Sequence, residues 1–239
     1  MKFVLHHESG ILMIRPFRSP RIAIIAALVA MAFAPFALAQ SDQQKLVDAA
    51  DASLSNFMRD PNMSWFQQNI GNARGVLFAP EVLKAGFIFG GSGGRALLVA
   101  KDRKSGKWVG PAFYALATAS VGFQAGVSIS ETVALVMSDK GMNSLLAPSF
   151  KIGGDASVAA GPVGAGAKSD IVADLVTFSR SKGLYGGLNL DGTHVNTADD
   201  WNQAYYGQSV LATDILVRMS IHATGAEKLL ADVAAAASK

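Results

Sequence analysis

The 239-residue chain contains no cysteine, and this absence excludes several classes of structure and chemistry. Without thiols there is no disulfide framework, no thiolate metal site and no cysteine nucleophile. Histidine is also scarce: beyond residue 39 only His194 and His222 occur, without metal-ligand spacing, and we interpret both as surface or capping residues. We therefore predict a domain without metal or cofactor, stabilised by its core alone, since about 200 residues bury roughly 70% of their unfolded surface.

Charged residues make up only 16% of the chain, and the small positive excess lies at the N-terminus. Residues 1–39 hold four Lys or Arg and one Glu, whereas residues 40–239 hold 17 residues of each sign. The region after residue 39 is therefore formally neutral. Its net charge gives no support for binding nucleic acid or for strong non-specific attraction to an anionic membrane.

The N-terminal segment predicts export. A basic stretch ending at Arg21 precedes the uncharged 17-residue run Ile22–Leu38, and Ala37-Leu38-Ala39 has the small-x-small pattern that signal peptidases cut. We expect a signal peptide at residues 1–39, starting at Met1 or at Met13, with cleavage after Ala39 and a periplasmic or secreted product. A retained anchor is the alternative, because the apolar run is near the lower limit for spanning a bilayer.

Glycine is concentrated between residues 71 and 192, which hold 21 of the 24 glycines. Glycine is disfavoured inside helices and collects at turns, bulges and curved strands. The distribution predicts a single domain at 40–239, with a helical lead-in at 40–72, a β-rich core at 73–195 and a helical tail at 196–239. The predicted fold class is α+β: a strongly twisted, Gly-rich antiparallel sheet or barrel-like core with N-terminal and C-terminal helices.

Hydrophobic periodicity locates the helices. Apolar residues recur at three- and four-residue intervals from Leu46 to Met58, which predicts a helix with Ser41 as its N-cap. Asp60-Pro61 should end it, because the residue before proline avoids helical geometry. Further helices are predicted at Met63–Ile70, Asp139–Leu146, Asp199–Tyr206 and Gly225–Ala237.

Alternation of apolar and polar residues locates the strands. From Ser120 to Ser130 the alternation is nearly strict, which predicts one half-buried strand. Its expected apolar face consists of Val121, Phe123, Ala125, Val127 and Ile129. Shorter strands are predicted at Gly75–Ala79, Gly86–Phe89, Ala96–Lys101, Val133–Met137, Asp155–Ala160, Ile171–Ser179 and Leu184–Leu190.

The segment Gly90–Gly94 matches the G-x-S-x-G nucleophile elbow, with Ser92 as the candidate nucleophile. The candidates for the other two triad residues follow in the order that a hydrolase of this type requires: Asp170, Asp191, His194 and His222. However, four glycines around any serine satisfy the pattern, and the downstream chain does not alternate helices with strands. We interpret the segment as a hairpin turn, predict a non-catalytic protein and retain a serine hydrolase as the less favoured alternative.

Asp170 and Asp174 are a second candidate for chemistry, as a pair of carboxylates. On one strand they would lie roughly 13 Å apart, whereas paired-carboxylate glycosidases need about 5–9.5 Å. We interpret them, together with Lys168, as solvated or barrel-lining charges.

Several long glycine-rich segments resemble the SYLF domain family, also described as Ysc84-type, and the likeness covers about residues 45–220. The segments are VLKAGFIFGGSGGRALLVAKD (82–102), GPAFYALATASVGFQAG (110–126), SFKIGGDASVAAGPVGAGAK (149–168), FSRSKGLYGGLNLDG (178–192) and NQAYYG (202–207). The resemblance implies a lipid-binding domain without hydrolase chemistry. Eukaryotic members bind phosphoinositides, and some bind actin.

The resemblance leads us to expect an exported, non-catalytic protein that associates with envelope lipid or another amphiphile. A structural or partner-binding envelope protein without a lipid ligand is the alternative. In the family, phosphoinositide binding is linked to a basic N-terminal helix, but the corresponding helix here has four aspartates against one lysine and one arginine. The expected lipid-binding residues are therefore cations of the family-like segments: Lys84, Arg95, Lys168, Arg180 and Lys182.

Overall fold

The computed structural model describes residues 40–86, 89–121, 126–164, 171–181, 184–186, 192–222 and 224–239. The predicted signal peptide at 1–39 lies outside the described residues. Residues 40–239 form one compact unit, because they contact one another far more than they contact residues 1–39. Both hydrophobic clusters belong to this unit, which therefore carries its own core. Within the described ranges, no helix has the length and hydrophobicity needed to cross a membrane.

The helical lead-in begins as predicted, with α2 at Asp42–Arg59. The Ser41 hydroxyl accepts a hydrogen bond from the backbone N–H of Gln44 at 3.2 Å and so caps the first turn. Pro61 ends the helix. The fully buried apolar side chains of α2 are Val47, Ala50, Leu54 and Phe57. Three short helical segments follow: η1 (Pro61–Met63), α3 (Ser64–Asn69) and η2 (Ile70–Asn72).

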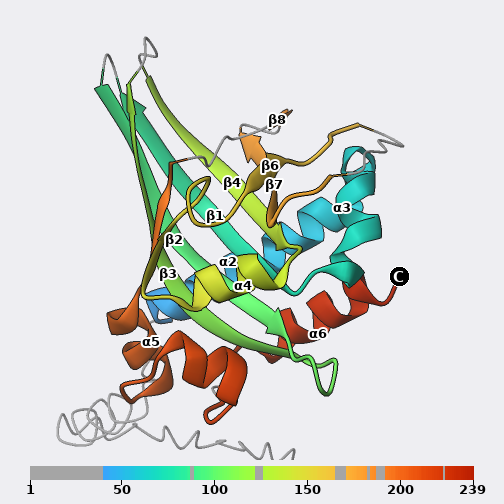
Figure 1. Ribbon diagram of the computed structural model, residues 1–239, viewed down its shortest axis with the longest axis vertical. Helices are drawn as coiled ribbons and strands as arrows, with labels where there is room; N and C mark the ends of the chain where they lie inside the picture. Colours follow the sequence, from blue (N-terminus) through green and yellow to red (C-terminus); the bar gives the residue numbers. More distant parts are fainter. Residues whose placement is uncertain are drawn as a thin grey trace, which may run out of the picture. The chain divides into compact units, whose positions relative to one another are not determined.

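The core is one curled, mixed sheet that forms a half-barrel (Figure 1). Its strands are β1 (Gly75–Gly86), β2 (Phe89–Lys101), β3 (Trp108–Val121), β4 (Gly126–Val136), β5 (Ser149–Lys151), β6 (Val158–Ala160), β7 (Leu175–Ser181), β8 (Leu184–Gly186) and β9 (His194–Thr197). The order is β5-β9-β3-β2-β1-β4-β7-β6, with β8 also pairing β7. Only the β6–β7 pair is parallel among the described strands. Because β4 returns beside β1, strands β1–β4 form a Greek key.

Helices cover the two faces of the sheet unequally. One hydrophobic cluster joins α2, α3 and α6 (Glu227–Ala237) to a face that includes Val76 and Phe78. We call this the helix face. On the opposite face, Leu77 and Tyr114 pack with α4 (Asp139–Leu146), with β5 and with η3 (Asp214–Arg218). Figure 1 shows α2 and α6 behind the strands and α4 in front of them. The α+β class and the terminal helices are therefore confirmed, and α5 (Asp199–Tyr206) also matches its predicted bounds.

The predicted continuous strand Ser120–Ser130 is wrong. β3 ends at Val121 and β4 begins at Gly126, while residues 122–125 lie outside the described residues. The two strands do not pair, since β2 and β1 lie between them. Alternation alone reports which residues share a face, and it can continue in register from one strand into the next.

The hairpin turn predicted at Gly90–Gly94 is also wrong, because these residues lie inside β2. Most of β3, together with β5 and β9, was not predicted either. Gly110-Pro111 interrupts the alternating pattern of β3, and a Gly-Pro pair usually marks a turn or the end of a strand. In the structure β3 continues through these residues, with a shift in its register against β2. β5 and β9 are too short for a period of two to be recognised.

Candidate functional site

An exposed apolar surface lies on the helix face, near the ends of β1 and β4 that project beyond the helices (Figure 1). Leu83 is 50% exposed, Val127 68% and Ile129 57%. Leu83 lies directly opposite Ile129, and Ala85 lies opposite Val127. We call these four residues the apolar patch. Large apolar side chains exposed side by side mark an interaction surface more often than scattered ones do.

Small residues extend the apolar patch across the two neighbouring strands. Gly93 of β2 lies opposite Leu83, and Gly91 lies opposite Ala85. The next strand contributes Ala117 and Ala119 in the same register, and both are exposed. Four strands therefore present a smooth surface of glycine, alanine and branched aliphatic residues, without a charged side chain among them.

A β-bulge in β1 determines which residues form this surface. The register of β1 shifts by one residue between Phe78 and Glu81 against β2, and between Ala79 and Val82 against β4. Even-numbered residues such as Phe78 lie on the helix face before the bulge, and odd-numbered residues such as Leu83 lie there after it. Gly94 permits the close approach, because a Cβ at this position would lie 2.4 Å from the Glu81 carbonyl oxygen.

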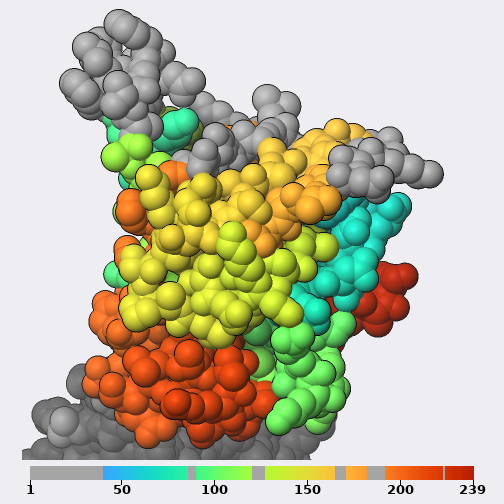
Figure 2. All heavy atoms as spheres, viewed as in Figure 1, coloured from blue at the N-terminus to red at the C-terminus, as the bar shows by residue number. Residues whose placement is uncertain are grey.

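The opposite face of the same strands is lined with hydroxyl groups. Lys84 lies between Ser92 and Ser128 in the strand register. Thr118 and Thr193 share a hydrogen bond of 2.7 Å between their hydroxyl oxygens. Figure 2 shows this side of the molecule, where residues that follow β4, coloured yellow to orange, lie over the sheet. The end of the sheet is therefore amphipathic, with its apolar side on the helix face.

The geometry around Ser92 does not form a nucleophile elbow. Ser92 lies in the middle of β2 between Lys84 and Thr118, within an antiparallel part of the sheet. His194 lies opposite Ala117 and therefore on the other face of the sheet from Ser92. A general base must lie within hydrogen-bond reach of the hydroxyl that it activates, so Ser92 and His194 cannot work together in this arrangement.

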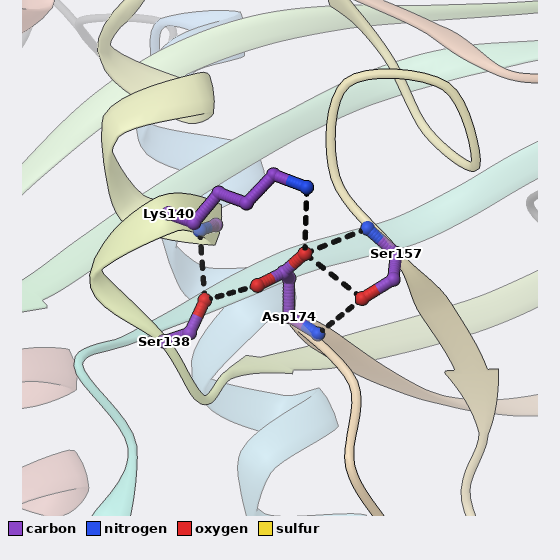
Figure 3. Close-up of polar contacts among 5 residues, drawn as sticks. Ser138, Lys140, Ser157 and Asp174 are labelled. Carbon is purple, nitrogen blue, oxygen red and sulfur yellow. Dashed lines mark hydrogen bonds and ion pairs between the residues drawn. The ribbon is translucent and has the colours of Figure 1, made fainter.

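Asp174 is a structural anchor, and the predicted pair with Asp170 is not tested because Asp170 lies outside the described residues. Figure 3 shows the Asp174 side chain between the start of α4 and the residues before β6 and β7. The Ser138 hydroxyl donates to Oδ1, the Ser157 N–H and hydroxyl each donate to Oδ2 at 2.8 Å, and the Lys140 Nζ lies 3.6 Å from Oδ2.

The hydrogen bond from Ser138, followed by those from Ser157 and the charge of Lys140, lowers the pKa of Asp174 to about 2, although partial burial acts in the opposite direction. The carboxylate therefore stays ionised and fully engaged at neutral pH. Its described contacts tie together three segments: the start of α4, the residues before β6 and the residues before β7. In the described part of the chain, no three His, Asp or Glu residues come together as metal ligands.

Of the expected lipid-binding cations, the structure describes Lys84, Arg95 and Arg180, and it does not bring these three together. Lys84 and Arg95 lie on opposite faces of the sheet. Arg95 Nη2 lies 3.9 Å from Asp200 Oδ2. The Arg95 guanidinium also lies over the Trp201 ring, with 4.7 Å between Cζ and the ring centroid. Arg180 is ion-paired with Glu131. Lys168 and Lys182 lie outside the described residues, so lipid contact by any of the five stays a prediction.

Sequence reasoning missed the apolar patch in two ways. Val127 and Ile129 were expected on a buried face, and their exposure shows that this expectation is wrong. Leu83 was not placed on any strand. Its exposure depends on the bulge in β1 and on where α2 ends, which the local sequence pattern does not report.

Comparison with known proteins gives one family match. The family model described as "Ysc84: Las17-binding protein actin regulator" matches residues 117–236. Protein YSC84 of Saccharomyces cerevisiae is 33% identical over 142 residues, which are 56% of this chain and 30% of that protein. The human SH3 domain-containing YSC84-like protein 1 is 30% identical over 152 residues, which are 62% of this chain and 44% of that protein. The similarity thus spans less than half the length of these relatives.

Proposed function

Because this chain belongs to the Ysc84, or SYLF-domain, family, we propose that it is a non-catalytic, lipid-binding protein of the cell envelope. The lipid or amphiphile contacts the apolar patch. The observation that carries the proposal is the pairing of exposed Leu83 with Ile129, beside Val127, at the projecting end of the helix face.

The expected strength of binding follows from the exposed area. Full burial of a Leu, Ile or Val side chain contributes roughly 1.5–3 kcal/mol. Burying the exposed half to two-thirds of Leu83, Val127 and Ile129 contributes about 4 kcal/mol on that scale. This is somewhat less than one acyl chain provides, at an association constant of about 10⁴ M⁻¹. We therefore expect weak, reversible adsorption to a lipid surface.

The charge distribution suggests how this binding differs from that of a basic interfacial helix. α2 carries Asp42, Asp48 and Asp51 against Lys45 and Arg59, and Lys45 is already paired with Asp42 at 2.8 Å. Such a helix is poorly suited to an anionic surface. If the uncharged patch makes the contact instead, binding should depend little on salt or on the anionic lipid fraction.

Export is part of the proposal, and its support is the leader sequence. A basic stretch, the apolar run Ile22–Leu38 and the small-residue exit at Ala39 are the three parts of a secretory signal. An exported domain meets the lipids of the envelope and not cytosolic phosphoinositides. We therefore do not extend the ligands of intracellular relatives to this chain.

Vesicle flotation of residues 40–239 tests lipid binding directly. We expect flotation with both phosphatidylcholine and mixed phosphatidylglycerol vesicles, and at least a tenfold weaker association after Val127→Ser and Ile129→Ser together. Val172→Ser is the matched control, because Val172 is 99% exposed but lies outside the patch. Flotation of the patch variant at the level of the control, or binding only to anionic vesicles, would contradict the proposed contact.

A protein partner is the second candidate for the same surface. It is favoured by the names of relatives, such as LAS seventeen-binding protein 3 of Saccharomyces cerevisiae, which is 32% identical over 142 residues. The two candidates differ in one outcome. If patch variants float with vesicles like the unmodified domain but lose a crosslink to a defined envelope protein, the partner-binding function is supported and the lipid function is not.

A further inference from the structure

A basic pocket lies at the end of the sheet away from the apolar patch. It has a volume of about 190 Å³ and lies between η2, the start of β1 and the hairpin that joins β2 to β3. A pocket of this size has room for several water molecules or for a group the size of a phosphate. Its cationic lining residues are Arg74, Lys101 and Arg103.

The charge around this pocket is positive although residues 40–239 are neutral as a whole. The hairpin sequence from Lys101 to Lys107 contains four cations within seven residues. With Arg74 included there are five positive charges, against the carboxylates of Asp102 and Asp139. Asp102 is engaged within the hairpin, where its Oδ2 accepts the Ser105 N–H at 2.8 Å.

The cations are held close together but are only weakly neutralised. Arg74 Nε lies 3.4 Å from Asp139 Oδ1, and Arg103 Nη2 lies 3.0 Å from Asp139 Oδ2, so two guanidinium groups share one carboxylate. Lys101 Nζ donates to the Gly71 carbonyl oxygen at 3.1 Å, which fixes its position and leaves two ammonium N–H groups for another acceptor.

We propose that this pocket binds a phosphate group, as a free anion or as a phosphate monoester. Guanidinium groups form paired hydrogen bonds with phosphate oxygens, and the lysine adds a positioned charge. Asp139 is the internal competitor. Its side chain is 46% exposed, and exposed ion pairs contribute little to stability, so an arriving dianion can displace it from one or both arginines.

The pocket and the apolar patch are separate sites. Gly75, next to the pocket, and Leu83, in the patch, are eight residues apart on β1, which corresponds to about 26 Å. This distance exceeds the Debye length of about 8 Å at physiological ionic strength. The two sites should therefore act independently, and the inference does not rest on the proposed lipid function.

Titration of inorganic phosphate into residues 40–239, followed by amide NMR shifts, tests the site. We expect saturable shifts centred on Ala73, Lys101 and Gly106. Lys101→Gln should weaken binding about tenfold, as expected for loss of a hydrogen bond to a charged group. Asp139→Asn should tighten it several-fold, because it removes the competing carboxylate. Lys151→Gln on β5 is the matched control and should leave the affinity unchanged.

Vesicles of phosphatidylcholine with and without phosphatidic acid identify the source of the phosphate. Lower flotation of the Lys101→Gln variant on phosphatidic acid alone supports a lipid headgroup, and unchanged flotation with weakened phosphate binding supports a soluble ligand. Either outcome retains the pocket. Equal phosphate affinities for the unmodified domain and its Lys101→Gln and Asp139→Asn variants, or shifts spread over Lys151 and other surface lysines, would overturn it.

Discussion

Replacing Asp174 by asparagine should lower the free energy of unfolding by about 2 kcal/mol at neutral pH. The pKa of this carboxyl is about 2 in the folded protein, against an ordinary value of 3.8, and each unit corresponds to about 1.4 kcal/mol. Its side chain is only 13% exposed, so solvent screens these contacts little. An asparagine keeps one acceptor oxygen and presents an NH₂ group to donors on the other side, so at least one hydrogen bond from Ser138 or Ser157 is lost.

The lowered pKa of Asp174 also determines how its contribution to stability changes with pH. Because the pKa of Asp174 is lower in the folded state than in the unfolded chain, its stabilisation is complete above about pH 4 and is lost as the pH falls through about 2. The difference between the unmodified domain and Asp174→Asn should therefore be constant near neutrality and shrink in acid.

Urea unfolding followed by tryptophan fluorescence measures both quantities, and for a domain of this size 2 kcal/mol corresponds to about 4–8 °C in Tm. Asp155→Asn is the control, because the exposed Asp155 carboxylate accepts a backbone N–H from Lys151 at 2.8 Å and should matter by less than about 1 kcal/mol. The reasoning fails if the two variants are equally stable at pH 7, or if the deficit of Asp174→Asn persists undiminished at low pH.

Two further substitutions test the packing of the sheet and its helices. Gly94→Ala should lower the free energy of unfolding by about 1–3 kcal/mol, because the added Cβ would overpack the bulge. Gly154→Ala is the control: its added Cβ would lie 3.6 Å from the nearest atom, so its stability in the same urea titration should be nearly unchanged. Asn202→Ala should lower the free energy of unfolding by about 2–4 kcal/mol. The buried Asn202 side chain accepts a hydrogen bond from the Phe113 N–H at 2.9 Å and donates one to the Phe113 carbonyl oxygen at 3.4 Å. Equal urea midpoints for this variant and for Gln203→Ala, at an exposed position, would contradict that role.

Elements with local signals could be predicted from the sequence. α4 has the bounds Asp139–Leu146, because the hydroxyl of Ser138 caps its N-terminus, accepting the Gly141 N–H at 3.0 Å. α5 ends where Gly207 adopts a left-handed conformation with φ 72°. Such caps act within a few residues, so local patterns report them.

The order of the strands and the exposure of their faces could not be predicted in this way. Pairing of Gly75 with Val136 joins residues far apart in the sequence. The basic pocket shows the same limit: the charges from Lys101 to Lys107 are visible in the sequence, but Arg74 and Asp139 reach them only through the folded chain. The apolar patch depends on how far the helices extend along the sheet, which is a property of the tertiary packing.

The additional residue in β1 near Pro80 has a further consequence for this surface. Deleting that residue would remove the bulge and leave Leu83 opposite Ile129, because regular alternation from Phe78 would then place Leu83 on the same face. If all residues of β1 were retained but the strand paired regularly, without the bulge, Lys84 would instead lie opposite Val127 on the helix face. Whether the strand accommodates the extra residue as a bulge therefore decides whether an aliphatic or a cationic side chain reaches this surface.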